Sequence, residues 1–385
     1  MLKWEIRKLC TRFTVISILV LLLLNLTTIL ILHGAEGTES GKLIREARAE
    51  LIDAYHNDRE TYNALYADYQ KQSAEYENWL MYGDGGFTWD NKLIDFENYG
   101  DRQLWNDVLS EIERAESYNK DIEKVLREAY ARLKELGDRR GDYTYEYQVN
   151  LILHYEELAE MQITPQDVLG WNEYFSLVSP VIFLTMAMIL IGVQLFLNEK
   201  QARFTSILHV CRYGEARTRL AKIGSLFCIT VVLVSAFTLL PLVILAFTTG
   251  LSDSNQVIQA LSNFEYCHLE LTILEYLLLR FAANVLVFFV LALLTAVLGQ
   301  ITGSFVVTIG GMLVFLAVNA VLPVGFFTAA FVNYLFERYR AVNFFGIHIP
   351  AVLFCILLIA VIAAGAFILA MRMKINLREY RWIEK

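Results

Sequence analysis

The polar side chains that could do chemistry do not form a catalytic motif. The sequence holds no G-x-x-x-x-G-K-[ST] phosphate loop, no H-E-x-x-H zinc motif and no G-x-S-x-G nucleophile motif. Its six histidines are scattered along the chain. Asp84, Asp90 and Asp95 lack the alternating oxygen ligands of an EF-hand calcium loop. We therefore expect no catalytic residue, no metal site and no ATP bound by a phosphate loop of this chain.

Two charged side chains interrupt an otherwise apolar stretch. Glu275 and Arg280 both lie near one end of the apolar block 271–299. A charge inside a membrane segment is a functional candidate, because it is costly to hold there. Interfacial snorkelling, or pairing of the two side chains with each other, explains them without any function. Both interpretations stay open at this point.

Six long apolar blocks hold most of the hydrophobic residues, which make up 56% of the 385 residues. A helix needs about 20 apolar residues to cross a bilayer core of about 30 Å. The blocks that approach or exceed this length are 13–33, 175–197, 223–249, 271–299, 303–322 and 351–371. The pattern predicts an all-α membrane protein with six transmembrane helices. The first block is too long for a typical signal peptide and predicts a retained anchor.

The charges between the blocks predict the orientation in the membrane. Segments 1–13, 198–222 and 372–385 together hold 15 Lys or Arg against 5 Asp or Glu. Segment 34–174 holds 15 Lys or Arg against 31 Asp or Glu, and loop 250–270 has acidic residues but no Lys or Arg. The positive-inside rule therefore places both termini in the cytoplasm and segment 34–174 outside. The basic residues lie next to the membrane, which argues against nucleic-acid binding.

Segment 34–174 predicts a long helical, coiled-coil extracellular domain between spans one and two. Positions spaced alternately by four and three residues predict a heptad seam. They are Val108, Ile112, Ala115, Asn119, Ile122, Leu126, Ala129, Leu133 and Leu136. We expect two helices, 41–81 and 103–137, to pack as an antiparallel hairpin, followed by a third helix at 145–161. Trp171 and Tyr174 then suit an aromatic belt at the membrane surface.

The turn between the two long helices is rich in glycine and carries aromatic side chains that we expect to be exposed. Tyr82, Phe87 and Trp89 are the candidates for a contact with a partner or substrate. A purely structural turn explains the same residues equally well. The segment 34–174 has no cysteine, so no internal disulfide can stabilise it.

The cytoplasmic loop 198–222 has the pattern of a docking helix. Apolar side chains at three-and-four spacing give it one hydrophobic face, which suits a groove on a cytoplasmic partner. The candidate contact residues are Glu199, Arg203, Phe204, Ile207, Leu208, Cys211, Gly214, Arg217 and Lys222. This loop resembles the coupling helix of type-2 ABC exporter permeases, which reads Glu, Gly-Thr, a Leu-rich turn, Gly-Arg and Lys. Glu199, Leu208, Gly214 and Lys222 fit that pattern, whereas Ala202-Arg203 and Glu215 depart from it.

The order of the other segments is similar to that family. Residues 1–13 predict an interfacial helix before the first transmembrane helix, 14–33. Spans two to six occupy 175–371, and 372–385 forms a cytoplasmic tail. The outer segment 324–349 resembles the family's short re-entrant helices, with Phe326, Phe327, Phe331 and Tyr334 as a possible outer gate. A large insertion between spans one and two resembles a subset linked to antimicrobial peptide resistance.

The resemblance implies the permease subunit of an ABC exporter in the bacterial plasma membrane, and no enzyme by itself. ATP and Mg²⁺ would bind a dimer of a separate ABC ATP-binding subunit, and a second permease copy or a related permease would complete the pathway. The substrate implied is a peptide, an antibiotic or a lipid-like molecule. A sensory, signalling or scaffold membrane protein with a coiled-coil ectodomain stays open as the alternative. Copurification of a P-loop ATPase would separate these classes.

Overall fold

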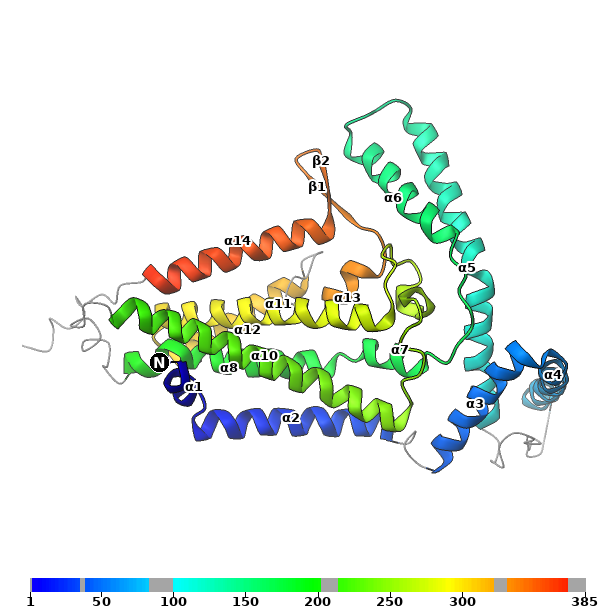
Figure 1. Ribbon diagram of the computed structural model, residues 1–385, viewed down its shortest axis with the longest axis horizontal. Coiled ribbons are helices and arrows are strands. Elements are labelled where there is room, and N and C mark those ends of the chain that lie inside the picture. The colour runs from blue at the N-terminus through cyan, green and yellow to red at the C-terminus, as the bar shows by residue number, and fades with distance from the viewer. Residues whose placement is uncertain (1, 35–38, 83–99, 202–213, 322–330, 373–385) are drawn as a thin grey trace, which may run out of the picture.

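The computed structural model describes residues 2–34, 39–82, 100–201, 214–321 and 331–372. The described chain is mostly helical, and its long apolar helices run side by side (Figure 1). A set of more polar helices, α3 to α6, lies across one end of them. We call this end the insert end. The N-terminal helix α1, Leu2–Leu9, lies at the opposite end, which we call the α1 end.

Five helical segments are long and apolar enough to cross a membrane: α2, α7 with α8, α10, α11 and α14. Their lengths follow from runs of apolar residues, since only a helix satisfies every backbone polar group in lipid. The helices are α2 Arg12–His33, α7 Leu169–Ser176, α8 Ser179–Gln201, α10 Gly214–Thr248, α11 Ile273–Thr302 and α14 Ala351–Arg372. The membrane character predicted from composition is confirmed at this level.

The sixth predicted span, 303–322, forms a shorter helix, α12 Phe305–Val321. Its 17 residues extend about 25 Å, less than the ~30 Å of a bilayer core. The residues that follow it lie outside the described part of the chain, so a sixth span stays a prediction. A short turn joins α11 to α12: Gly303 caps α11 in the left-handed conformation at φ 65°, and α12 begins two residues later.

Helices α8 and α11 form the centre of the apolar bundle. Half or more of their most apolar stretches is buried, against 11% for α2 and 17% for α14. The two helices approach closely at Gly192, where an added Cβ would lie 2.5 Å from the carbonyl oxygen of Ala292. Only glycine fits such a contact between backbones. Large side chains from α8, α10 and α11, among them Met188, Phe237 and Leu291, complete this core.

The insert consists of four helices: α3 Glu39–Asn57, α4 Arg59–Tyr82, α5 Gly100–Leu136 and α6 Tyr143–Ala159. The predicted continuous helix 41–81 is wrong, because the chain breaks at Asp58. The Asp58 carboxylate accepts hydrogen bonds from the backbone N–H of Thr61, at 3.2 Å, and from its hydroxyl. An Asp in this position caps a new helix and competes with continuing the old one.

The predicted two-helix hairpin is also wrong, because α5 packs against different helices along its length. Its first half forms a core with α3 and α4 around Leu51, Tyr62, Trp105 and Val108. Its second half packs on α6 through Tyr118 and Ile122. The predicted seam is thus only partly buried, and Asn119 is exposed. The third predicted helix, 145–161, is present as α6.

The described fold is not entirely helical. Strands β1 Ala341–Phe344 and β2 Ile347–Pro350 form an antiparallel hairpin before α14. The turn places Phe345 and Gly346 at positive φ, 53° and 89°. The all-α prediction is therefore wrong for this segment. Of the predicted re-entrant helices in 324–349, the described residues hold one short helix, α13 Phe331–Phe336.

Candidate functional site

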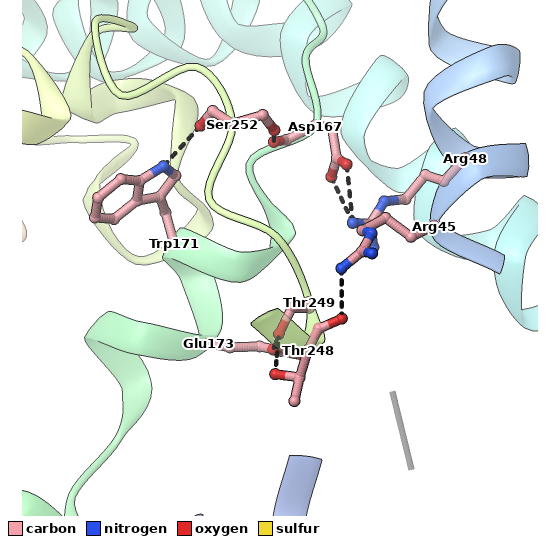
Figure 2. A network of polar contacts seen from close by, with 8 residues as sticks. All are labelled: Arg45, Arg48, Asp167, Trp171, Glu173, Thr248, Thr249 and Ser252. Atoms are coloured by element: carbon pink, nitrogen blue, oxygen red, sulfur yellow. Dashed lines mark hydrogen bonds and ion pairs between the residues drawn. The ribbon is translucent and has the colours of Figure 1, made fainter. Parts of the chain in front are cut away.

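The insert is attached to the apolar helices by a network of polar contacts at the insert end (Figure 2). The guanidinium of Arg48, on α3, forms an ion pair with Asp167, with Nη2 lying 2.7 Å from Oδ1. Both side chains are largely buried. One turn earlier on α3, Arg45 donates from Nη1 to the carbonyl oxygen of Thr248 at 2.8 Å. Thr248 is the last residue of α10, so this bond satisfies a carbonyl left free by the helix end.

The same network ties α7 to the loop after α10. The indole N–H of Trp171 donates to the carbonyl oxygen of Ser252 at 2.7 Å, and the Ser252 hydroxyl donates to the carbonyl oxygen of Asp167 at 2.7 Å. The Thr249 hydroxyl donates to the Glu173 carboxylate at 2.9 Å. Trp171 is 4% exposed, so it lies inside the protein and not in the expected surface belt. Tyr174, 6% exposed, departs from that prediction in the same way.

Two glycines allow the segments of this network to pack closely. We call the packed region around Arg45, Arg48, Asp167, Gly170 and Gly250 the junction. An added Cβ at Gly170 would lie 1.9 Å from the carbonyl oxygen of Gly250, so α7 and the loop after α10 touch through their backbones. Gly250 itself has φ 85°, a conformation that other residues rarely adopt. Its Cα faces the Arg45 side chain, since a Cβ there would lie 3.1 Å from Arg45 Cδ. The junction therefore joins α3, α7 and the end of α10 as one packed unit.

A buried carboxyl lies beside the junction. Glu111, on α5, is 5% exposed, and its Oε2 has no hydrogen-bond partner among the described residues. Burial raises the pKa of Glu111 to about 7, and the nearby Arg114 opposes this shift. The charges of Asp167 and Arg48 act on it as well. A carboxyl with a pKa near 7 changes charge close to neutral pH.

The histidines that are scattered in the sequence partly gather in space. His154 of α6 and His268 of the loop before α11 have ring centroids 5.3 Å apart. Tyr339 stacks 6.2 Å from His348 of β2, and its hydroxyl lies 3.1 Å from His348 Nε2. Burial, together with a smaller effect of the neighbouring His154, lowers the pKa of His268 to about 4. No group of three metal-binding side chains occurs in the described part of the chain.

At the α1 end, basic side chains near the start of α10 tie it to its neighbours. Lys222 donates from Nζ to the carbonyl oxygen of Leu195 at 3.0 Å, and the same nitrogen lies 5.0 Å from the Phe196 ring centroid. Arg219 donates from Nη1 to the carbonyl oxygen of Ala370, in the last turn of α14, at 2.8 Å. Lys222 is 2% exposed. Its side chain holds α10 against α8 and is not accessible to another molecule in the described part of the chain.

Most of the other predicted contact residues lie outside the described residues. They are Arg203, Phe204, Ile207, Leu208, Cys211, Phe87, Trp89, Phe326 and Phe327. For Glu199, Tyr82 and Phe331 the structure gives the helical backbone alone, at the end of α8, the end of α4 and the start of α13. Gly214 begins α10, and Arg217 is exposed on its first turn.

The last predicted gate residue, Tyr334, lies on α13 at the insert end. The Arg340 guanidinium stacks 3.6 Å from its ring centroid and donates to its hydroxyl at 2.9 Å. The neighbouring Asn333 donates to the carbonyl oxygen of Phe175 at 2.8 Å and accepts from the Tyr276 hydroxyl at 3.1 Å. These bonds hold α13 against α7 and α11. Tyr334 is thus part of a packed cap, and its role as a gate stays a prediction.

The junction could not be predicted from the sequence. The ion pair of Arg48 and Asp167 joins residues 119 positions apart, and no local motif links them. One signal was present: Gly250 and Gly170 each lie where an apolar block begins or ends. A glycine at such a boundary is typical of a close backbone approach.

Comparison of the chain with protein-family models, with curated proteins and with solved structures gives no match.

Proposed function

We propose that this chain is the transmembrane permease subunit of an ABC exporter, driven by ATP hydrolysis on a separate subunit. The proposal rests on the sequence pattern of loop 198–222 and on the order of the segments along the chain. The substrate class we propose is a peptide, an antibiotic or a lipid-like molecule. We place the chain in a bacterial plasma membrane, as the family resemblance implies, with both termini in the cytoplasm, as the charge distribution predicts.

The observation that carries the proposal is the continuity of α10. It is one helix of 35 residues, about 52 Å long, that begins within the proposed coupling segment 198–222. At its other end, Thr248 accepts a hydrogen bond from Arg45 of the insert. A displacement at Gly214 would therefore be carried along one continuous helix to the insert, past Pro241, which removes one backbone hydrogen bond inside the helix. Lys222 and Arg219 tie the first turns of this helix to α8 and α14, so the neighbouring helices would move with it.

The mechanism we propose is rigid-body alternating access. ATP binding would close a dimer of ABC ATP-binding subunits with their Mg²⁺, and loop 198–222 would transmit that motion to α10. The insert, which we place outside the membrane, would respond through the junction. A second permease copy, or a related permease, would supply the other half of the pathway. The apolar surface left on α2 and α14 is available to lipid or to that copy.

The test is copurification followed by coupled ATPase assay. The wild-type chain should copurify with a P-loop ATPase of roughly 25–35 kDa, the size of a one- to two-domain protein. Arg217→Glu reverses an exposed charge at the start of α10 and should abolish stimulation of that ATPase in proteoliposomes, whereas Arg217→Lys should keep it. Unchanged coupling in Arg217→Glu would reject the docking surface. Absence of any ATPase from the wild-type complex would favour the sensory or scaffold alternative.

A further inference from the structure

Arg280 is a buried cation with an unused hydrogen-bond donor inside the apolar bundle. It is 8% exposed, and its Nη1 is buried without a hydrogen-bond partner among the described residues. The pairing with Glu275 considered from the sequence is absent: Glu275 instead accepts from the Thr272 N–H at 2.8 Å and caps α11. No ion pair to Arg280 occurs in the described ranges, and Arg280 does not snorkel out of the protein.

Two aromatic rings lie next to this guanidinium. Its carbon Cζ is 5.2 Å from the ring centroid of Phe175 and 5.6 Å from that of Tyr174. Such contacts attract a cation to the ring faces. They leave the buried Nη1 without an acceptor, because rings do not replace the hydrogen bonds that a guanidinium makes in water. The site therefore holds a desolvated positive charge that is only partly compensated.

Arg280 opens into a pocket between α8, α10 and α11. The pocket is a small, partly open cavity with a volume of about 30 Å³. Its polar lining includes Arg280, Asn284 and Thr238, and the remaining walls are mostly apolar, with Leu184, Phe237 and Leu277 among them. One cationic group and an amide among apolar walls is the lining expected for a ligand with a small anionic group and an apolar remainder.

The depth of the pocket indicates where such a ligand comes from. Arg280 lies seven residues into α11, about 10 Å from the start of the helix and about 11 Å from its midpoint. That is just inside the boundary of a hydrocarbon core about 30 Å thick. Leu278 and Leu239, on the helices that form the pocket, are 61% and 56% exposed. The helices that form the pocket therefore expose apolar surface, which in a membrane faces lipid, so we expect the ligand to come from the bilayer.

We propose that this pocket binds the phosphate headgroup of a membrane amphiphile, with the Arg280 guanidinium as the hydrogen-bond donor to the phosphate. A guanidinium presents two parallel N–H donors that match a phosphate oxyanion, and these charge-assisted bonds are strong in a site without water. The small cavity takes the headgroup, and the tail lies in the bilayer against the apolar surfaces of the surrounding helices. Binding needs neither ATP nor a partner subunit, so it can be tested apart from the proposed transport.

The test is a titration of the full chain in a neutral maltoside detergent, with bound amphiphile counted by native mass spectrometry. Dodecyl phosphate should bind as one molecule per chain. Dodecyltrimethylammonium, which has the same tail and the opposite charge, should not compete. Inorganic phosphate should bind far more weakly, because it lacks the tail. Equal binding of the cationic amphiphile, or of inorganic phosphate, would overturn the proposal.

Variants locate the site. Arg280→Gln should weaken dodecyl phosphate binding at least about tenfold, the usual effect of losing a charge-assisted hydrogen bond. Arg338→Gln removes one exposed positive charge near α13 and should leave the affinity unchanged. Leu277→Trp narrows the pocket without altering its charge and should also weaken binding, which keeps the proposal testable if Arg280→Gln does not fold. Affinity within twofold of wild type in Arg280→Gln, or in Leu277→Trp, would refute the site.

Discussion

The buried carboxyl of Glu111 makes the stability of the insert depend on pH. The folded-state pKa of about 7 lies above the value of 4.5 for an exposed glutamate, mainly because burial disfavours the charged form. The stabilisation that comes from holding this carboxyl neutral is fully present below about pH 4.5. It is lost as the pH rises through about 7, since folding then requires either protonation or a buried charge.

The size of the effect follows from the two pKa values. A shift from 4.5 to about 7 changes the free energy of unfolding by about 2.5 kcal/mol between pH 5 and pH 8. That corresponds to roughly a 70-fold change in the local opening equilibrium. The affected amides are those of α3 and the first half of α5, which form one core with Val108 and Ile112.

Hydrogen exchange followed by mass spectrometry measures this equilibrium in the full chain. After correction for the intrinsic rate at each pH, amides of α3 and the first half of α5 should open more often at pH 8 than at pH 5. Glu111→Gln should remove the difference, since an amide stays neutral. Glu113→Gln, on the exposed side of the same helix, is the matched control and should retain it. Equal opening of the wild type at both pH values would refute the buried-carboxyl argument.

Three further outcomes are expected. Asp167→Asn leaves the charge of Arg48 buried without its counter-ion. It should therefore lower the free energy of opening of α3 by about 3 kcal/mol in the same exchange experiment. An opening free energy unchanged from wild type would mean that the ion pair does not hold the insert. Gly192→Ala should lower the yield of folded protein in detergent, because its Cβ meets an α11 carbonyl at 2.5 Å, whereas Gly365→Ala, in open space, should not. Because His268 is held neutral when folded, with a pKa of about 4, stability should fall as the pH drops from about 6.5 towards 4. Thermal unfolding of wild type and His268→Gln at pH 7 and pH 4.5 checks this, with a smaller loss expected in the variant.

The apolar helices were the part of the fold that sequence alone could predict. About 20 apolar residues in a row have few structures available other than a membrane helix, so composition decides the element. The third insert helix was also predicted within two residues, 145–161 against the observed Tyr143–Ala159. Its pattern agrees with its packing, because Ile152, Tyr155 and Leu158 share one buried face.

The arrangement of the insert could not be predicted in the same way. Asp58 lies in the middle of the predicted helix 41–81, and an Asp there is either an exposed position of one helix or the cap of a second. The choice depends on tertiary packing, here of Tyr62 on Trp105, with ring centroids 5.9 Å apart. The heptad pattern of α5 has the same ambiguity, because a seam predicts that a helix has partners but does not say that they change along its length.

The candidate sites depend on contacts between distant residues, which leave no local pattern. Arg48 and Asp167 are ordinary surface residue types, and burial alone gives their pair its importance. Arg280 was noticed because a charge in an apolar block is rare. Its lack of a partner became evident only when the structure placed Glu275 at the helix cap. The sequence therefore identified Arg280 as unusual, and the structure showed that its Nη1 lacks a hydrogen-bond acceptor among the described residues.

The backbone contact at Gly192 restricts how the bundle can move. If α8 slid by one residue along α11, a side chain larger than hydrogen would meet the carbonyl oxygen that Gly192 now faces. Helices α8 and α11 therefore keep one fixed position relative to each other. Helices α2 and α14, with little of their apolar length covered within the chain, present the surface that lipid or a second copy would contact.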